Sequence, residues 1–362
     1  MRFHNLPSLD ISPIVIYEKN AKNITGLVYY DLACYQALQG KKKAALKNFE
    51  KAFNSGWNDY NHAKGDSDID NLRKEKKYLE IMAKMRLDSD YLYILQQAEG
   101  YNRTETKPIC YNESVTDTLP RFTYMNPNDS NLVQLRKHFN LDSIAGSGDE
   151  ISKIKNLLYW VHNIVPHDGN SRNPEERNTI AMVELCKKEN RGVNCRMMAQ
   201  MLNECYLAMG FKSRFITCMP KVMINDCHVI NAVYSNTLDK WLWMDPTFNA
   251  YVTDEKGNLL GIGEVRERLR NNQPVVLNED ANWNNKNKQT KEYYLDYYMT
   301  KNLYYVTCPL QSEYNAETNY PGKKWPMYIS LVPEGYSSNG KPGATAYDSH
   351  NDLYFWQSPY QE

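Results

Sequence analysis

The sequence lacks several features that would assign it to common classes of protein. No apolar run approaches the ~18 residues of a membrane-spanning helix, and Met1–Pro7 is followed by polar and charged residues rather than an apolar signal core. The eight cysteines include no C-x-x-C pair, which argues against a disulfide framework and a zinc ribbon. Lys plus Arg and Asp plus Glu are both 43, so no basic excess favours nucleic acid or an acidic membrane.

What is present is the composition of an ordinary folded protein. Hydrophobic residues make up 42% and charged residues 24% of 362 residues, enough for two or three domains with cores of their own. We expect no metal or other cofactor, because no ligand spacing of a metal site is found. We expect a cytoplasmic protein, or a periplasmic or exported one if a signal peptide was removed from it.

Residues 1–105 predict a small helical domain. Within 23–55, small and large apolar residues recur at steps of three and four, which is typical of two closely packed helices. This hairpin, with Gly40 near its turn, resembles one tetratricopeptide repeat. The resemblance implies a surface for a protein partner. Asp66 begins an acidic stretch that we interpret as a helix cap rather than a calcium loop.

Residues 106–310 predict the main domain, in which helices come first and strands afterwards. The expected helices cover 129–139, 149–165 and 179–188, and the expected strands cover 212–220, 227–234 and 240–245. This order indicates an α+β fold rather than repeated βαβ units. Residues 311–362 are rich in Gly, Pro, Ser, Asn and Tyr, and predict an irregular segment packed on the core with one strand near 327–332.

Cys195 begins a further predicted helix, which Gly210 ends. The apolar residues after Cys195 recur at helical spacing: Met198, Leu202, Cys205 and Met209. Cys195 therefore lies at the helix N-terminus, where unpaired N–H groups and the helix dipole favour a thiolate and make it nucleophilic.

His228 and Asp245 complete a predicted catalytic arrangement. His228 leads one alternating strand, and Asp245 ends the next one just before Pro246. A hairpin of these strands brings both side chains to the same end of the sheet. Cys195 would then attack, His228 would take its proton, and Asp245 would orient the imidazole.

Over residues 150–250 the sequence resembles the transglutaminase-like superfamily of papain-type thiol enzymes. The matching residues are Gly192, Cys195, Ala199, Gly210, Arg214, His228, Tyr234, Trp241 and Asp245-Pro246-Thr247. The resemblance implies a Cys–His–Asp site on a helix packed against an antiparallel sheet. It also implies acyl transfer at an amide or ester, with water or an amine as acceptor.

The sequence departs from the superfamily pattern at two places. Asn194 stands directly before the cysteine, with Gly192 three residues back, and Val229-Ile230 follow the histidine where a tryptophan is common. These departures concern the shape of the substrate site. No calcium site or extra β domain of the animal cross-linking enzymes is matched, so the resemblance is to the microbial (bacterial) type of core, which implies a peptidase or amidase.

Other candidate residues have a structural interpretation beside the functional one. Asn194, Trp160 and Trp243 are candidates for an oxyanion donor or the cleft wall, although for Trp160 we favour a core role, because it falls within a helical apolar pattern. His167 could line the site, and a solvated loop is the interpretation we favour. Tyrosines between 293 and 305 could form a platform for peptide or sugar rings, but we favour packing over the sheet.

The sequence thus predicts a thiol-dependent amide hydrolase or acyl transferase that works through a thioester on Cys195. The expected partners are peptide, glycopeptide or protein amides. The alternative is a non-catalytic binding module with the same fold, which docks a peptide, glycan or protein partner. Taken singly, each of Cys195, His228 and Asp245 would be read as a structural residue, and the triad hypothesis depends on their order and joint placement.

Overall fold

The computed structural model divides into two compact units, Met1–Ile94 and Leu95–Glu362. The boundary predicted between residues 105 and 106 falls outside the described residues, so its position stays a prediction. The segment 311–362, predicted as an irregular segment packed on the core, is part of the second unit. The structure describes residues 18–99, 111–112, 119–221, 227–338 and 346–360.

The described part of the first unit is helical. Its elements are α1 (Glu18–Leu38), α2 (Lys42–Asn54), α3 (Tyr60–Gly65), the 3-10 helix η1 (Ser67–Leu72) and α4 (Lys76–Ser89). Helices α1 and α2 form the predicted hairpin, with Gly40 at a φ of 72° in the turn and Phe49 in the core. The Asp66 carboxylate accepts the Asp68 N–H at 2.9 Å and the Tyr30 hydroxyl at 2.7 Å, so it caps η1. The tetratricopeptide likeness stays a prediction.

The second unit contains helices and strands in the predicted order. Its helical elements, of which the first begins just before it, are α5 (Tyr91–Glu99), α6 (Ser130–His138), α7 (Leu141–Ala145), α8 (Glu150–Ile164), α9 (Thr179–Glu189), α10 (Cys195–Ala208), α11 (Ile262–Arg270), the π-helix η2 (Glu292–Met299), α12 (Thr300–Asn302) and α13 (Asp352–Phe355). Its strands are β1 (Thr123–Tyr124), β2 (Ser213–Met219), β3 (His228–Ser235), β4 (Lys240–Met244), β5 (Val252–Thr253), β6 (Val276–Leu277), β7 (Asn282–Trp283), β8 (Asn287–Lys288), β9 (Tyr305–Pro309), β10 (Gln311–Ser312), β11 (Tyr328–Leu331) and β12 (Ala346–Ser349).

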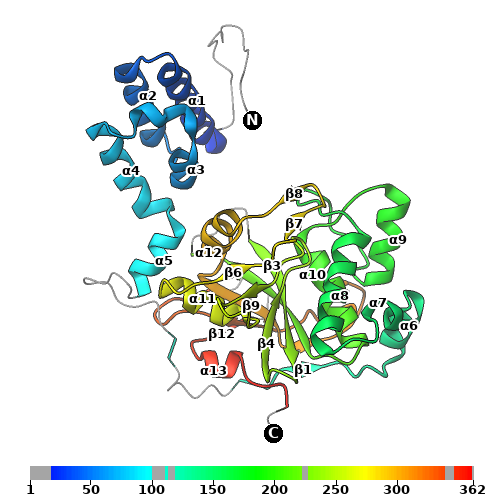
Figure 1. Cartoon of the computed structure of the whole chain (residues 1–362). Coiled ribbons are helices and arrows are strands. Elements are labelled where there is room, and N and C mark those ends of the chain that lie inside the picture. The colour runs from blue at the N-terminus through cyan, green and yellow to red at the C-terminus, as the bar shows by residue number, and fades with distance from the viewer. Residues whose placement is uncertain (1–17, 100–110, 113–118, 222–226, 339–345, 361–362) are drawn as a thin grey trace. The chain divides into compact units, whose positions relative to one another are not determined.

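The central sheet has the order β12-β11-β9-β2-β3-β4. All of its neighbours are antiparallel except β11 and β12, which are parallel. The strand expected near 327–332 is β11, and it joins the sheet through β9. Helix α10 packs against β2 and β3 (Figure 1). The predicted α+β class, with a helix on an antiparallel sheet, is confirmed.

The sheet buries both of its faces, because alternate residues of each strand point to opposite sides. Leu242 and Met244 belong to the core that contains Met198 and Leu202 of α10. Trp241 lies on the other side, with the guanidinium carbon of Arg214 4.2 Å from the centre of its ring.

Helix α10 is buried from Met197 to Ala208, on its polar side as well as its apolar one. The sequence predicted a single buried face. The polar side chains of α10 are buried because α9 and residues 312–317 cover that side, as hydrogen bonds of Asn203 to Ser312 and of Glu204 to Thr179 show. The helix that begins with Cys195 is therefore the centre of the unit.

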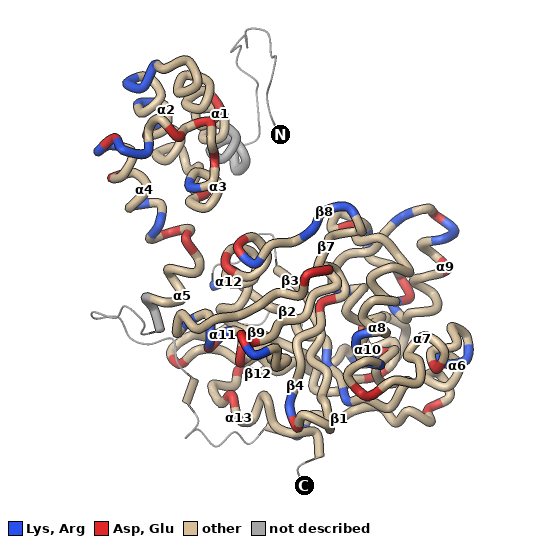
Figure 2. Tube along the Cα trace, in the orientation of Figure 1, with Lys and Arg blue, Asp and Glu red and all other residues tan. Residues whose placement is uncertain are grey.

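Charges of both signs are interspersed along the described chain (Figure 2). This distribution fits the formal charge of zero. The expectation that nucleic acid is not a partner stays a prediction. Within the described residues, no helix combines the length and the apolar character needed to span a bilayer.

Candidate active site

Cys195 is half-buried and is the first residue of α10. The N-cap is Asn194, whose Oδ1 accepts the Met197 N–H at 3.2 Å and whose Nδ2 donates to Asn173 Oδ1 at 2.6 Å. The N–H groups of a first helical turn have no partners inside the helix, so the positive end of the dipole lies at the Cys195 thiol. The structure gives Asn194, an oxyanion candidate from the sequence, a capping role.

His228 and Asp245 are in direct contact. The Nε2 atom of His228 and the Oδ2 atom of Asp245 are 2.7 Å apart, and the two side chains are 1% and 0% exposed. The register of β3 with β4 pairs Asn231 with Met244, so Asp245 lies just past the last pair, at the end of the sheet where β3 begins. The hairpin expected from the sequence therefore brings these two residues together.

The Nδ1 atom of His228 is left to face Cys195. Among the described residues it is buried without a hydrogen-bond partner of standard geometry, while Nε2 is taken by Asp245. Hydrogen bonds between catalytic side chains are often long in a protein without substrate, and they shorten when a substrate is bound. The side chain of Asn231, three residues further along β3, bonds to the Ala199 carbonyl at 2.9 Å and so ties this strand to α10.

Electrostatics favour a charged pair between Cys195 and His228. Burial opposes ionisation of the Cys195 thiol, but the neighbouring His167 and His228 side chains and the charge of His228 outweigh it and lower the pKa of Cys195 to about 6. Burial also opposes a charge on His228, but the Asp245 carboxylate outweighs it and raises the pKa of His228. At neutral pH this arrangement supports a thiolate next to an imidazolium.

Two further groups hold the Asp245 carboxylate in place, and the sequence did not predict these contacts. The Tyr294 hydroxyl donates to Asp245 Oδ2 at 2.6 Å, and the Thr247 N–H donates to Oδ1 at 2.9 Å. The Trp243 indole N–H donates to the Tyr294 oxygen at 3.2 Å. Trp243 was a candidate for the cleft wall, but it is fully buried and acts behind Asp245. The substrate side of the site is therefore formed by other residues.

Helix α8 contributes a histidine to the site, and its tryptophan has the core role that we favoured from the sequence. Trp160 packs on Phe139, with ring centres 5.0 Å apart, in the core beside α6. His162 contacts the Pro246 carbonyl through Nδ1 and Asn282 Oδ1 through Nε2, each at 3.0 Å. Trp160 thus has the core role, and His162 fixes the loop after Asp245. Nothing in the spacing of α8 singles out His162 for this contact.

His167 is half-buried and close to Cys195, not in a solvated loop as we favoured from the sequence. The Trp283 indole N–H donates to His167 Nδ1 at 2.9 Å. A backbone bridge pairs His167 with Val193, two residues before Cys195. The sequence separates these residues widely, so only the fold reveals their contact.

Two aromatic rings pack against His228. Those of Phe248 and Tyr298 have their centres 5.5 Å and 5.2 Å from the imidazole. Tyr298 belongs to the tyrosine-rich segment, which packs beside the sheet as expected, with Tyr294 buried and Tyr293 exposed. We expected the hydroxyls at the rim, whereas that of Tyr294 is buried against Asp245.

The C-terminal part of the chain supports the first turn of α10. Arg196 forms a two-pronged ion pair with Glu317, with Nη2–Oε1 and Nε–Oε2 distances of 2.6 and 2.8 Å. Gln200 donates to the same carboxylate at 2.5 Å, and the hydroxyl of Tyr328 also bonds to it. Burial opposes a charge on Glu317, but Arg196 outweighs it and lowers the pKa of Glu317.

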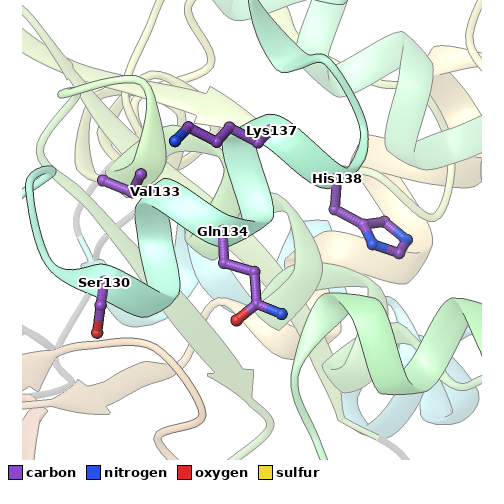
Figure 3. Close-up of a pocket in the computed structure, with 5 residues that line it drawn as sticks. All are labelled: Ser130, Val133, Gln134, Lys137 and His138. Atoms are coloured by element: carbon purple, nitrogen blue, oxygen red, sulfur yellow. The ribbon is translucent and has the colours of Figure 1, made fainter.

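Other hollows and clusters do not compete with this site. A surface hollow of about 450 Å³ is lined by Ser130, Val133, Gln134, Lys137 and His138 (Figure 3). All five belong to α6, and none belongs to the Cys195 site. Within the described ranges, no three His, Cys, Asp or Glu side chains are grouped as a metal site.

Comparison with known proteins identifies the part of the chain that holds this site. Residues 137–246 match the family model of the transglutaminase-like superfamily. The match shows that this segment resembles the superfamily, and it covers less than a third of the chain. The transglutaminase-like segment includes Cys195, His228 and Asp245, whereas Trp283, Tyr294 and Glu317 lie beyond it.

The other comparisons add little to this assignment. No curated protein matches the chain. A solved structure described as "a Putative Cysteine Protease" from Cytophaga hutchinsonii is 15% identical over 40% of this chain, with a TM-score of 0.26. The match covers 48% of that chain, so this protein spans about half its length.

Proposed function

We propose that the protein is a thiol-dependent amide hydrolase or acyl transferase with Cys195 as nucleophile, His228 as acid and base, and Asp245 as the orienting group. The observation that carries the proposal is a half-buried cysteine at the start of α10 beside a buried His228–Asp245 pair. The match of residues 137–246 to the transglutaminase-like superfamily supports the same class of chemistry.

Acylation starts from the thiolate–imidazolium pair. The sulfur of Cys195 attacks the amide carbonyl carbon, a C–S bond forms, and the carbonyl oxygen takes up the negative charge. When this intermediate collapses, the C–N bond breaks and His228 gives its proton to the leaving nitrogen. The amine departs and a thioester on Cys195 remains.

Deacylation restores the resting pair. Neutral His228 takes a proton from water or from an acceptor amine, which attacks the thioester carbon. The C–S bond then breaks, and the thiolate and the imidazolium are formed again. The Cys195 N–H, at the start of α10, is the first donor for the oxyanion in both halves of the reaction.

Peptide, glycopeptide and protein amides are the proposed substrates. The test combines intact-protein mass spectrometry with a library of synthetic peptides and glycopeptides. We expect an acyl adduct that maps to Cys195, and hydroxylamine should convert it to a hydroxamate, because a thioester reacts with this amine. The ratio of acid to hydroxamate product measures the choice between water and amine.

Two cysteine variants make the test specific. Cys195→Ala should abolish adduct and turnover, while Cys186→Ala, which removes a buried thiol of α9, should keep both. Unchanged turnover in Cys195→Ala would refute the proposal. If peptides bind without adduct or product, and the thiol reacts no faster than an ordinary one, the chain is a binding module of the same fold.

A further inference from the structure

His167 is tied by its backbone to the segment that leads into Cys195. The Val193 N–H donates to the Pro166 carbonyl at 3.1 Å, and the Asp168 N–H donates to the Val193 carbonyl at 2.8 Å. The Asn284 side chain accepts the His167 N–H at 2.7 Å and donates to the His167 carbonyl at 2.9 Å. The loop is therefore bonded on both sides and has little freedom beside the thiol.

Gly192 permits this close approach. A Cβ atom at that position would lie 2.4 Å from the Pro166 oxygen, which is closer than real atoms come. The only side chain that fits is a hydrogen atom. Gly192, which the sequence places three residues before the cysteine, thus allows the His167 loop to pack against the strand that enters α10.

The Trp283 contact determines which nitrogen of His167 carries a proton. An indole N–H is a donor and never an acceptor, so His167 Nδ1, 2.9 Å away, must accept. An accepting ring nitrogen has no hydrogen, and the ring proton is therefore on Nε2. That N–H is the one donor of the ring available to a neighbour. The bridge to Val193 holds the ring near Cys195, and His167 is one of the two histidines that lower the pKa of this thiol.

We propose that His167 donates its Nε2–H to the sulfur of Cys195, and that Trp283 holds His167 in this tautomer. The inference rests on the proposed function, in which Cys195 is the nucleophile. The two histidines then have separate tasks. His228 exchanges a proton with the substrate, whereas His167 keeps its proton and supplies a fixed hydrogen bond, because Nε2 is already protonated and Nδ1 is engaged by Trp283.

This bond has a definite consequence for the nucleophile. A hydrogen bond that is stronger to a thiolate than to a thiol favours ionisation, so it adds to the effect of His228. Trp283 becomes a positioning residue, since it acts on Cys195 only through His167. His167 and Trp283 both lie outside the Cys195–His228 pair, which is the pair that transfers protons.

The first test reads the tautomer directly in the unchanged full-length chain. Nitrogen-15 NMR at pH 7 should show His167 Nε2 bonded to hydrogen and Nδ1 as a bare, accepting nitrogen. In Trp283→Phe, which keeps an aromatic ring but loses the donor, the signal of the Nδ1–H form should appear. A protonated Nδ1 in the unchanged protein would overturn the proposal, and this readout requires no variant and no substrate.

The second test measures the thiol. His167→Ala should slow iodoacetamide labelling of Cys195 at pH 6.5 by about threefold, the loss of thiolate at this pH when the pKa of the thiol rises from about 6 to about 7. His167→Gln should restore most of the rate, because its amide N–H can also donate. The control is Asn170→Ala, an exposed side chain in the same loop, which should leave the rate unchanged.

The outcomes separate this inference from the proposed function. Equal labelling rates in His167→Ala and the unchanged protein overturn the role of His167, even if peptides are turned over. Slower labelling with rescue by His167→Gln supports it, even if no peptide in the library is a substrate. Full turnover in Cys195→Ala refutes the proposed function without altering the tautomer result.

Discussion

The Tyr294 hydroxyl donates a 2.6 Å hydrogen bond to Asp245 Oδ2, the same oxygen that contacts His228. The carboxylate is thereby fixed from two sides, and the Thr247 N–H fixes its second oxygen. Trp243 in turn fixes Tyr294. The orientation of His228 therefore depends on Asp245, which Tyr294 of η2 holds in place, with Trp243 behind Tyr294.

Removing the Tyr294 hydroxyl should weaken both the site and the fold. Tyr294→Phe leaves Asp245 with one donor fewer and the buried Trp243 N–H without an acceptor, which costs about 1–3 kcal/mol in the free energy of unfolding. We expect turnover to fall about tenfold, for roughly 1.4 kcal/mol of lost orientation. Urea denaturation and turnover measure the two effects. Tyr293→Phe, at an exposed neighbour, is the control and should change neither.

The pH dependence of labelling reports the thiolate–imidazolium pair. Because the neighbouring His167 and His228 side chains and the charge of His228 lower the pKa of Cys195 to about 6, its labelling rate should rise through pH 6 and level off by pH 7 to 8. Asp245 raises the pKa of His228, so the imidazolium persists above neutral pH and the pair is lost only at alkaline pH. Peptide mass spectrometry from pH 5 to 10 measures this window.

Asp245→Asn should raise the pH at which the labelling of Cys195 begins. Without the negative charge the imidazolium is less stable, so the pKa of His228 falls and that of Cys195 rises toward the ordinary value of ~8.5. Turnover should drop by several orders of magnitude, about 10⁴-fold by analogy with other triads. An unchanged labelling midpoint in this variant would show that Asp245 does not control the pair.

Gly192→Ala should separate the His167 loop from the nucleophile. The new methyl group meets a backbone oxygen and cannot be accommodated by a rotamer change, so the loop or the start of α10 must move. We expect a loss of stability of about 1–3 kcal/mol and slower labelling of Cys195. Gly169→Ala is the matched control from the same loop, since its Cβ would lie 3.6 Å from His167 Cε1, an ordinary contact.

Glu317→Gln should destabilise the protein through Arg196. The guanidinium loses its buried counter-ion, which costs about 3 kcal/mol, the lower end of the usual range because the Arg196 side chain is 27% exposed. Since the pKa of Glu317 is lowered in the folded state, its contribution is present above the ordinary glutamate pKa of 4.5 and is lost as the pH falls. The difference between variant and parent in urea should therefore shrink on acidification. Glu292→Gln, at an exposed position, should show no such trend.

The fold around the site could be predicted from local patterns. The helices and strands between residues 129 and 245 agree with their predicted ends to about a residue, apart from the short α7. Periodicity of 3.6 and of 2 is strong in this part because each element buries a face. The contact of His228 with Asp245 followed from the same patterns, since a short hairpin fixes which strand ends meet.

The second layer of the site could not be predicted. His162, Trp283 and Tyr294 reach it from segments that are distant in sequence, through directed hydrogen bonds that leave no periodic signal. For His167 the sequence indicated only that it could line the site. Trp243, a candidate for the cleft, gives indirect support behind Asp245, whereas Trp160 has the core position that we favoured for it. The spacing of apolar residues indicates which positions are buried. It does not indicate which distant loops come together in the fold, and these hydrogen bonds depend on that.

The ion pair of Arg196 with Glu317 also has a consequence for how the protein is made. A ribosome releases the chain from its N-terminus, and Glu317 follows Arg196 by 121 residues. Until that stretch has emerged, the start of α10 has no counter-ion and β2 lacks β9, its neighbour in the finished sheet. A nascent chain that contains the whole transglutaminase-like segment therefore still lacks the counter-ion next to Cys195, and we expect this thiol to become reactive only after residue 317 has emerged.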